Sequence, residues 1–376
     1  MNKLHYEQRR ERLRKVMRQK GISALLVSHA ANRFYLSGFE LHDPQCNESA
    51  GRLVVMADGK DWICTDARYR DAARRLWDEE RILLYGADSA GDIGKLLTGL
   101  LAGQTGFSGG EGAGRIGFEA ESVTLTFYER FADAVGAGNL SRADGMVETL
   151  RQIKDADEIR CMEASCRLNH QLMEWLPAVL LPGRDEAAIA WDIEKFFREH
   201  GASELAFTSI VGRSQNAALP HYLPSTTEIL DTEDLVLVDV GARLQGYCSD
   251  QTRTFRISTG GARPAWADAF QRTLDTVREA QARAIAAIRP GVAACDVYQV
   301  ARRYFEEQGV ATAFTHSLGH GVGLETHEGP SLNSRNTAPL QPGMVVTVEP
   351  GLYYPEWGGV RWEYMVLVTE DGCRTL

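Results

Sequence analysis

The first 150 residues alternate short apolar runs with stretches of helical periodicity. Apolar runs typical of buried strands lie at 24–27, 53–56, 62–65 and 81–85. Charged and apolar residues follow a helical period over 3–20, which places Leu13 and Met17 on the inward face. A second helix is predicted over 67–77. Strands that alternate with helices in this way predict an α/β domain.

Beyond residue 150 the helical stretches become longer, and short turns separate the apolar runs. Helices are predicted at 155–180, 186–199, 264–288 and 293–308. Strands are predicted at 235–238, 252–257, 344–348 and 360–369. Because strands joined by short turns pair antiparallel, we expect a mostly antiparallel sheet. The change of pattern predicts two domains, an α/β domain over residues 1–150 and an α+β domain over residues 151–376.

A glycine-rich segment lies at 103–117 and contains Gly112-Ala113-Gly114-Arg115-Ile116-Gly117. This run matches the G-x-G-x-x-G pattern of dinucleotide-binding loops letter for letter. No apolar strand precedes it, however, and Ile116–Glu119 has the pattern of a strand where the motif requires a helix to begin. We therefore predict a surface loop and no phosphate site here.

The composition and the net charge of the chain argue against several classes of protein. Lys and Arg number 41 against 51 Asp and Glu, a net charge of −10, so nucleic acid is not expected as a main partner. No apolar run approaches the ~18 residues of a membrane span, and the N-terminal helix lacks the apolar centre of a signal peptide. Seven cysteines are scattered without a C-x-x-C pair, which predicts reduced thiols in a cytoplasmic protein.

Acidic residues stand in or at the ends of apolar runs, where carboxylates are costly. These residues are Asp239, Asp250, Glu349 and Glu363. Any one of them alone has the pattern of a turn residue or a cap, but a glycine-flanked histidine, His320, adds a nitrogen ligand. Carboxylates that are buried together repel and protonate unless cations neutralise them. Four carboxylates and one neutral imidazole carry a charge of −4, which matches two divalent cations.

The ligand types restrict the metal. Oxygen ligands with one nitrogen and no thiolate favour Mn²⁺, Co²⁺, Fe²⁺ or Zn²⁺ over metals that prefer sulfur. Two such ions ~3.5–4 Å apart can share a bridging water, lower its pKa and polarise a carbonyl group.

The segments around these residues resemble the pita-bread metallopeptidases, a superfamily that includes methionine aminopeptidase, prolidase, aminopeptidase P and creatinase. The resemblance rests on residues 239–242, 249–254, 319–323, 348–353 and 359–363. Residues 25–28, 32–39 and 117–120 are similar to the creatinase/prolidase N-terminal domain. The resemblance covers nearly the whole chain. It implies a pita-bread catalytic domain, a curved and mostly antiparallel sheet with helices, after an α/β creatinase-like domain.

Carried over by position, the resemblance implies a ligand set for two metal ions, with Mn²⁺ or Co²⁺ expected first. Asp239 would chelate one ion, and Asp250 would bridge both. His320 and Glu349 would bind the second ion, and Glu363 would bridge from the far side. Glu349 would also shuttle a proton while a metal-bridging hydroxide attacks the substrate.

Further residues match the superfamily's substrate site. These residues are His221, His316, His327 and Arg361. The resemblance implies that His221 and His327 contact the substrate and its oxyanion, and that His316 lies near the proline end. It also implies that Arg361 pairs with a bridging acid. The alternative for each histidine is an ordinary core or surface residue, and for Arg361 a solvated strand residue.

The chain departs from the prolidase-like pattern at one place beside the ligands. Those enzymes usually carry Asp or Asn directly after the last bridging glutamate, but here Tyr364 and Met365 follow Glu363. The departure leaves the ligand set intact and concerns the residues packed around Glu363, which tune metal affinity.

These observations predict a dinuclear metallopeptidase that splits an N-terminal residue from proline, either an X-Pro dipeptidase or an aminopeptidase P-like enzyme. The alternatives are a creatinase-like hydrolase or a lyase on the same fold, and a non-catalytic pita-bread binding protein. The resemblance also implies a homodimer in which the N-terminal domain of one subunit lines the other's cleft. An X-Pro peptide is the expected partner, with neither nucleic acid nor membrane.

Overall fold

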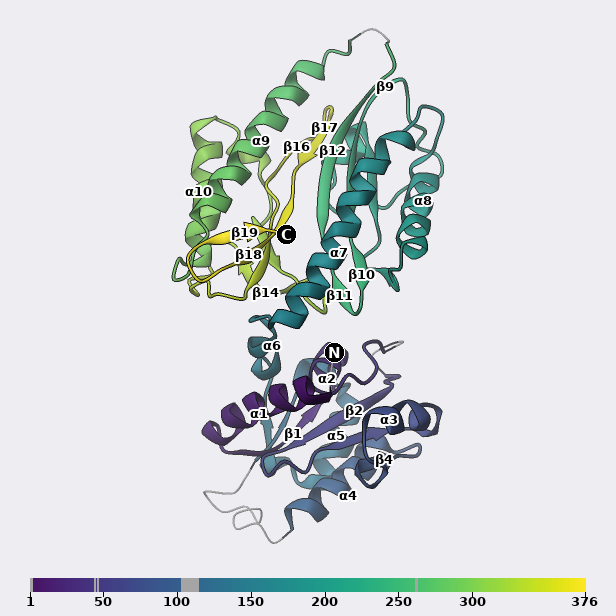
Figure 1. Ribbon diagram of the computed structural model, residues 1–376, viewed down its shortest axis with the longest axis vertical. Helices are drawn as coiled ribbons and strands as arrows, with labels where there is room; N and C mark the ends of the chain where they lie inside the picture. The colour runs from purple at the N-terminus through teal and green to yellow at the C-terminus, as the bar shows by residue number, and fades with distance from the viewer. Residues whose placement is uncertain (1–2, 44, 46, 103–114, 261–262) are drawn as a thin grey trace. The chain divides into compact units, whose positions relative to one another are not determined.

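The computed structural model describes residues 3–43, 45, 47–102, 115–260 and 263–376 (Figure 1). Contacts divide the chain into two compact units, Met1–Arg151 and Gln152–Leu376. The predicted loop at 103–114 lies outside the described residues, and the last residues of the glycine-rich segment begin a strand. Across the described ranges, no helix combines the length and the apolar character that a membrane crossing needs.

The N-terminal unit is built on one six-stranded sheet with the order β4-β3-β2-β1-β5-β6. Its strands are β1 (Ile22–Val27), β2 (Gly51–Met56), β3 (Trp62–Thr65), β4 (Ile82–Leu84), β5 (Arg115–Phe118) and β6 (Leu140–Arg142). β2 pairs antiparallel with β1 and β3, and the other neighbours are parallel. The strands predicted for this part of the chain are therefore confirmed, and the sheet is mixed.

Helices cover both faces of this sheet (Figure 1). They are α1 (Lys3–Gln19), α2 (Ala30–Ser37), α3 (Arg70–Leu76), α4 (Ser89–Leu101), α5 (Leu125–Val135) and α6 (Met146–Arg151). α4 and α5 pack on one face, where Val54, Ile93 and Phe131 are buried. α4 was not predicted from the sequence, because glycines interrupt its apolar pattern. Gly94 is needed there, since a Cβ would collide with the Cβ of Ala134 on α5.

The C-terminal unit carries two pairs of long helices on antiparallel sheets. The helices are α7 (Ala156–Trp175), α8 (Glu186–Glu199), α9 (Ala267–Ala287) and α10 (Ala294–Glu307). The sheets have the orders β11-β10-β7, β12-β9-β8, β14-β13-β15-β18-β19 and β16-β17. α7 and α8 share a core with β8 and β9, and α9 and α10 share one with β15 and β18. Every strand pair described in this unit is antiparallel, as the sequence predicted.

The strands of the first half are short except for one long hairpin. They are β7 (Glu204–Leu205), β8 (Ile210–Arg213), β9 (Glu233–Val240), β10 (Ala242–Leu244), β11 (Tyr247–Cys248) and β12 (Gln251–Ser258). β9 and β12 pair over eight residues each, from Val240↔Gln251 to Glu233↔Ser258. This hairpin carries the first predicted metal ligands at one end.

The second half of the C-terminal unit forms the five-stranded and the two-stranded sheet. Its strands are β13 (Gly319–Gly321), β14 (Glu328–Leu332), β15 (Val345–Val348), β16 (Gly351–Tyr354), β17 (Gly358–Arg361), β18 (Tyr364–Val368) and β19 (Cys373–Thr375). The continuous strand predicted over 360–369 is wrong. It is broken between β17 and β18, because the Glu363 N–H turns away to the carbonyl of Thr252 on β12, at 3.2 Å.

Some predicted helix bounds were also wrong. The helix expected over 155–180 ends at Trp175, and a 3₁₀ turn with Pro177 continues the chain. The helix expected over 264–288 begins only at Ala267, so Pro264 stands before it.

Candidate active site

Because side chains alternate in direction along β9, one acidic side chain points between the two halves of the C-terminal unit. Val236, Val238 and Val240 pack in the core under α7 and α8. Since successive strand residues face opposite sides, Asp239 lies on the other side, in phase with Leu235 and Leu237.

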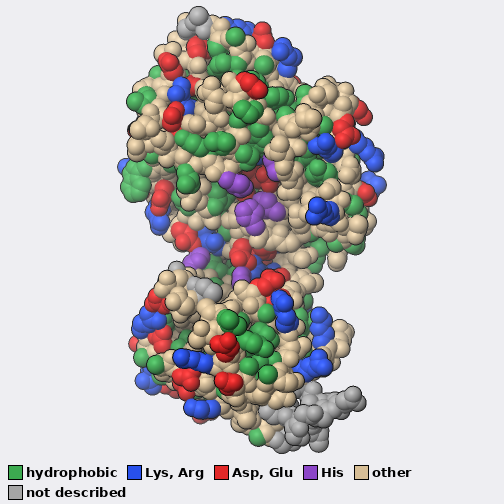
Figure 2. All heavy atoms as spheres, turned by 180° about the vertical axis from the view of Figure 1, so that it is seen from behind, with side chains coloured by type: hydrophobic (Ala, Val, Ile, Leu, Met, Phe, Trp, Pro, Cys, Tyr) green, Lys and Arg blue, Asp and Glu red, His purple; other side chains and the backbone are tan. Residues whose placement is uncertain are grey.

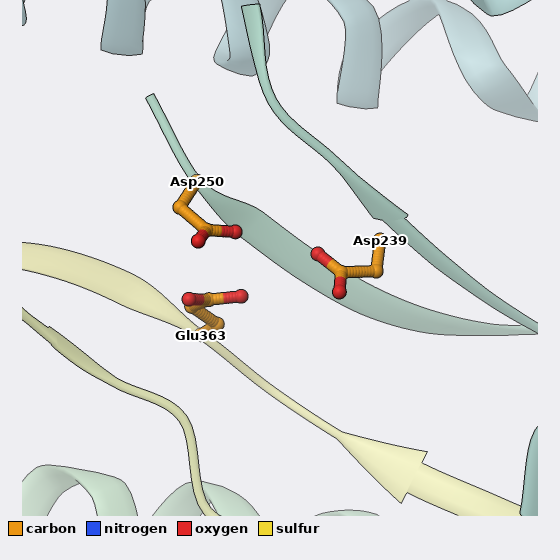
Figure 3. A group of neighbouring side chains, drawn as sticks. All are labelled: Asp239, Asp250 and Glu363. Carbon is orange, nitrogen blue, oxygen red and sulfur yellow. The ribbon is translucent and has the colours of Figure 1, made fainter. Parts of the chain in front are cut away.

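Three carboxylates converge there. Asp239 comes from β9, Asp250 directly precedes β12, and Glu363 occupies the break between β17 and β18. One carboxylate oxygen from each lies within 4.8 Å of the others, and Figure 3 shows the three side chains pointing toward one another. They are 8%, 6% and 1% exposed. Acids this close and this buried cannot all stay ionised unless cations lie between them.

The carboxylate oxygens of this cluster fit divalent cations. Asp239 Oδ1 and Glu363 Oε1 are buried and accept no hydrogen bond from the described residues. Burial, together with the charges of the neighbouring acids, raises the pKa values of Asp250 and Glu363 well above their usual range. A cation would satisfy both orphaned oxygens and favour the ionised carboxylates. Such hard oxygen ligands suit divalent metals that do not require sulfur.

β13 and the end of β15 contribute a nitrogen and a fourth carboxylate. His320 Nε2 lies 3.2 Å from Glu349 Oε1 and 3.7 Å from Asp250 Oδ2. His320 Nδ1 lies 3.0 Å from the carbonyl oxygen of Gly321, which assigns a proton to Nδ1 and leaves Nε2 toward the carboxylates.

The His320–Glu349 pair carries one proton that a metal ion would replace. Burial by itself lowers the pKa of His320, but the hydrogen bond and charge of Glu349 outweigh it and raise the pKa to about 9. Burial by itself raises the pKa of Glu349, but the same pairing lowers it to about 2. Both groups therefore favour a positive charge at Nε2, which a bound cation supplies.

Glycines on both sides of His320 allow β13 to pack closely. A Cβ at Gly319 would collide with the carbonyl of Thr347 on β15, and a Cβ at Gly321 would collide with the carbonyl of Gly329 on β14. Thr347 Oγ1 accepts from His320 N and donates to Glu349 Oε1, each at 3.0 Å. The Thr347 hydroxyl thus links β13 at His320 to the carboxylate of Glu349.

Arg361 holds the opposite side of the cluster. It is 3% exposed, and its Nη2 donates to Asp239 Oδ2 at 2.7 Å. Its Nε donates to Thr252 Oγ1 at 3.0 Å, and Thr252 donates onward to Glu363 Oε2 at 2.7 Å. The expected direct pairing with a bridging acid is therefore corrected. The ion pair is with Asp239, for which no bridging role was expected, because β9 brings that carboxylate to the end of β17.

His316 reaches the same network from the other side, and its ring nitrogens are engaged within the protein. Nδ1 lies 2.7 Å from the carbonyl oxygen of Ser317, and Nε2 lies 2.9 Å from the hydroxyl of Tyr353. Tyr353 accepts in turn from Arg361 Nη1 at 2.9 Å. A hydrogen-bond chain thus connects His316 to the arginine that grips Asp239. No role was predicted for Tyr353 from the sequence, although it belongs to the segment 348–353 on which the resemblance rests.

A cavity of about 590 Å³ opens beside these groups. The predicted residues that line it are His221, Asp239, Asp250, His316, His320, His327, Glu349 and Arg361. Glu363 is buried beneath them. Figure 2 shows histidine side chains gathered around acidic ones on this face of the C-terminal unit. The His327 ring centroid lies 4.3 Å from that of His320, and His221 is exposed.

The positions after Glu363, where the chain departs from the prolidase-like pattern, are filled by different contacts. Arg253 lies with its guanidinium carbon 4.1 Å from the ring centroid of Trp362 and 4.2 Å from that of Tyr364. Its Nη1 donates to the carbonyl of Glu363 at 2.6 Å. Met365 places its sulfur 3.2 Å from the backbone nitrogen of Asp250. Stacking on Arg253 beside Glu363 and a sulfur contact to Asp250 therefore occupy these positions.

Both units of the chain match known protein families. Residues 160–370 match Metallopeptidase family M24, and residues 9–153 match the Creatinase/Prolidase N-terminal domain. The chain belongs to metallopeptidase family M24. The predicted recognition is confirmed, and the carboxylate cluster of this M24 metallopeptidase is the place where its divalent metal fits.

Relatives match this M24 metallopeptidase over nearly its whole length. An uncharacterized peptidase, YqhT, from Bacillus subtilis (strain 168) is 34% identical over 97% of this chain and 96% of its own. The Xaa-Pro dipeptidase of Pyrococcus furiosus is 29% identical over 98% of this chain and 97% of its own. The solved Xaa-Pro dipeptidase from Bacillus anthracis superposes with a TM-score of 0.86 at 31% identity, covering 100% of this chain and 97% of that one. The predicted pair of domains, creatinase-like and pita-bread, is thereby confirmed.

Proposed function

We propose that this M24 peptidase hydrolyses the bond between an N-terminal residue and proline, as an X-Pro dipeptidase or aminopeptidase, with two divalent metal ions. One observation carries the proposal: a single cavity collects three of the predicted carboxylates, including Asp239 with its orphaned oxygen, together with His320 and two further histidines, His221 and His327. The similarity to proteins named Xaa-Pro dipeptidase and prolidase supports the prolyl part of the proposal.

Asp239, Asp250, His320, Glu349 and Glu363 would hold the two ions, with Mn²⁺ or Co²⁺ the expected species. When bound, the ions would supply an acidified water and a Lewis acid for the scissile carbonyl. Arg361 donates a hydrogen bond to Asp239 Oδ2, so Oδ1 remains for a metal ion. Thr252 donates to Glu363 Oε2, so Oε1 remains for a metal ion. Each of these two acids thus directs one defined oxygen toward the cluster.

Glu349 is proposed as the group that moves the proton. It lines the cavity and is held by Thr347, so its carboxylate can take a proton from the attacking water and deliver it to the leaving amine.

His221 and His327 are proposed as hydrogen-bond donors to the substrate. Burial and the nearby charge of His320 lower the pKa of His327, so its ring is neutral near pH 7 and carries one N–H. A donor aimed at the developing oxyanion stabilises the transition state more than the ground state. His316 cannot donate in the same way, because its nitrogens face Ser317 and Tyr353. We assign His316 and Arg361 to positioning Asp239 at the edge of the substrate cavity.

The prolyl preference is proposed from shape. A prolyl amide has no N–H, so the site needs no acceptor for it and must accept the ring by contact. Phe207, Ile210, Tyr222 and Leu223 supply an apolar part of the cavity lining. A homodimer and a cytoplasmic location remain predictions from the sequence.

The test compares Ala-Pro and Ala-Ala, then lengthens the prolyl substrate residue by residue. With Mn²⁺ or Co²⁺ present, replacing proline by alanine should lower kcat/KM at least ~10-fold, or ~1.4 kcal/mol. Equal cleavage of both dipeptides would overturn the prolyl assignment while leaving the metal site standing. Cleavage that stops at dipeptides indicates a dipeptidase, and cleavage of longer X-Pro peptides indicates an aminopeptidase.

A further inference from the structure

A second cavity, of about 470 Å³, lies within the N-terminal unit and uses none of the residues of the peptidase site. Two helices begin at its wall. Asp88, Ser89 and Ala90 line it at the start of α4, and Thr124, Thr126 and Phe127 line it at the start of α5. Its size falls within the range of small-molecule sites, roughly 300–1,000 Å³.

Arg52 on β2 points into this cavity from the sheet. It lies in phase with Val54 and Met56, which are buried under α4 and α5. Arg52 is only 8% exposed, and its guanidinium carbon lies 3.9 Å from the ring centroid of Phe127. Its Nε is buried without a hydrogen bond, and within the described chain no carboxylate forms an ion pair with it. Burial lowers its pKa, as expected for an under-compensated cation.

The acids near Arg52 are already engaged elsewhere. Arg68 donates to Glu48 at 2.9 Å and to Asp66 at 2.9 Å. Asp88 accepts from the N–H of Gly91 as the cap of α4. Asp43, the remaining nearby carboxylate, pairs with Arg33 at 2.9 Å. The positive charge of Arg52 is therefore left for a ligand.

The two helix ends strengthen the same preference. α4 has 13 residues and α5 has 11, and both direct their N-terminal ends toward the cavity. The first N–H groups of a helix have no acceptor within it, and the aligned peptide dipoles add a partial positive charge. Asp88 and Thr124 cap one N–H each, which leaves the N–H groups of Ser89 and Thr126 at the wall. Helix N-termini with a basic side chain are a recurrent anion-binding arrangement.

We propose that this cavity binds a small oxyanion, the phosphate or carboxylate group of a small molecule. Arg52 is its charged partner, and the first turns of α4 and α5 supply N–H donors. A planar guanidinium can bind either group through two parallel hydrogen bonds. Arg130, 60% exposed and also on the wall, adds a second cation at the rim, where its Nη1 lies 3.9 Å from Asp88 Oδ1.

The experiment titrates the full-length protein, without peptide substrate, with sodium phosphate, sodium succinate and sodium chloride at equal ionic strength. Calorimetry should give saturable binding of phosphate or succinate and none of chloride. Tighter binding of phosphate identifies a phosphate site, and tighter binding of succinate identifies a carboxylate site. If neither binds more tightly than chloride, the proposal is overturned.

Variants separate a binding role from a packing role. Arg52→Met keeps the apolar stem and should weaken anion binding at least ~10-fold, while its unfolding temperature in chloride stays equal or rises, because an unpaired buried charge is removed. Arg75→Gln removes an exposed charge of the same unit outside the cavity and should bind as the wild type does. Unchanged affinity in Arg52→Met would overturn the proposal. If that variant fails to fold, the exposed Arg130→Gln takes its place, and it must weaken binding measurably.

Discussion

Two buried glutamates differ in their surroundings: Glu119 in the N-terminal unit is a structural acid, and Glu363 in the C-terminal unit is a proposed metal ligand. They are 2% and 1% exposed, so burial does not distinguish them. Glu119 Oε2 accepts from the backbone N–H groups of Ser28 at 2.6 Å and His29 at 2.7 Å, and its Oε1 accepts from Asn32 Nδ2 at 2.7 Å. Both oxygens of Glu119 are therefore satisfied by the fold.

Glu363 has a different set of neighbours. Thr252 donates to its Oε2, and its Oε1 is orphaned. Burial raises the pKa of Glu119, and the hydrogen bond from His29 limits the rise to about 7. Burial with the charges of Glu349 and Asp239 raises the pKa of Glu363 well above its usual range. The number of hydrogen-bond donors around a buried carboxylate therefore indicates, better than its burial does, which carboxylate needs a cation as a partner.

Removing charge from the metal cluster should have the largest effect. Asp250→Asn and Glu363→Gln each take a negative charge from the site that is proposed to balance two divalent ions. Both variants should hold fewer than two ions per chain by elemental analysis. Their kcat/KM on an X-Pro peptide should fall by more than the ~10²–10³ that one catalytic donor contributes. If Glu363→Gln kept the metal content and turnover of the wild type, Glu363 would be a structural acid like Glu119.

Replacing the cavity histidines tests the proposed substrate contacts separately from metal binding, because the carboxylates stay unchanged. His327→Ala and His221→Ala should each lower kcat about 10²–10³-fold, or ~2.7–4 kcal/mol, with metal content unchanged, because each loses a transition-state donor. His200→Ala is the matched control, since His200 caps α8 outside the cavity. Loss of metal in His327→Ala would reassign that residue from substrate to ligand.

Arg361 tests whether the support of Asp239 matters as much as its charge. Arg361→Lys keeps the cation but loses the fork that joins Asp239, Tyr353 and Thr252. We expect metal affinity to fall ~10–100-fold, as for other changes beside metal ligands. A titration with a metal-buffered solution measures it. Arg283→Lys, an exposed pair with Glu279 on α9, should change nothing.

Glu119→Gln should have the smallest effect on activity. The amide places an NH₂ group against one of the N–H donors that the carboxylate accepted, so the free energy of unfolding should fall by ~1–3 kcal/mol. Denaturant titration of the metal-loaded protein gives this number. Metal content and kcat should match the wild type. If either falls together with stability, the two buried glutamates are not as separate as their donors indicate.

The acids and the histidine of the candidate metal site were predicted from the sequence. A strand pattern places a carboxylate at the end of an apolar run, and alternation then decides which side it faces. Glycines around His320 carry a similar local meaning, since they mark a backbone packed too closely for side chains. Such signals are local, because strand period and glycine geometry depend on a few neighbouring residues.

The tertiary structure alone decided which groups support those residues. Arg361 grips Asp239 from 122 positions away, and His316 turns both ring nitrogens to the protein because Tyr353 stands beside it. No role was predicted from the sequence for Glu119 or Arg52, since their roles depend on donors and acids brought from distant elements. Whether a hydrogen bond forms depends on the distance between donor and acceptor and on competition among nearby groups. Those distances exist only after the chain has folded.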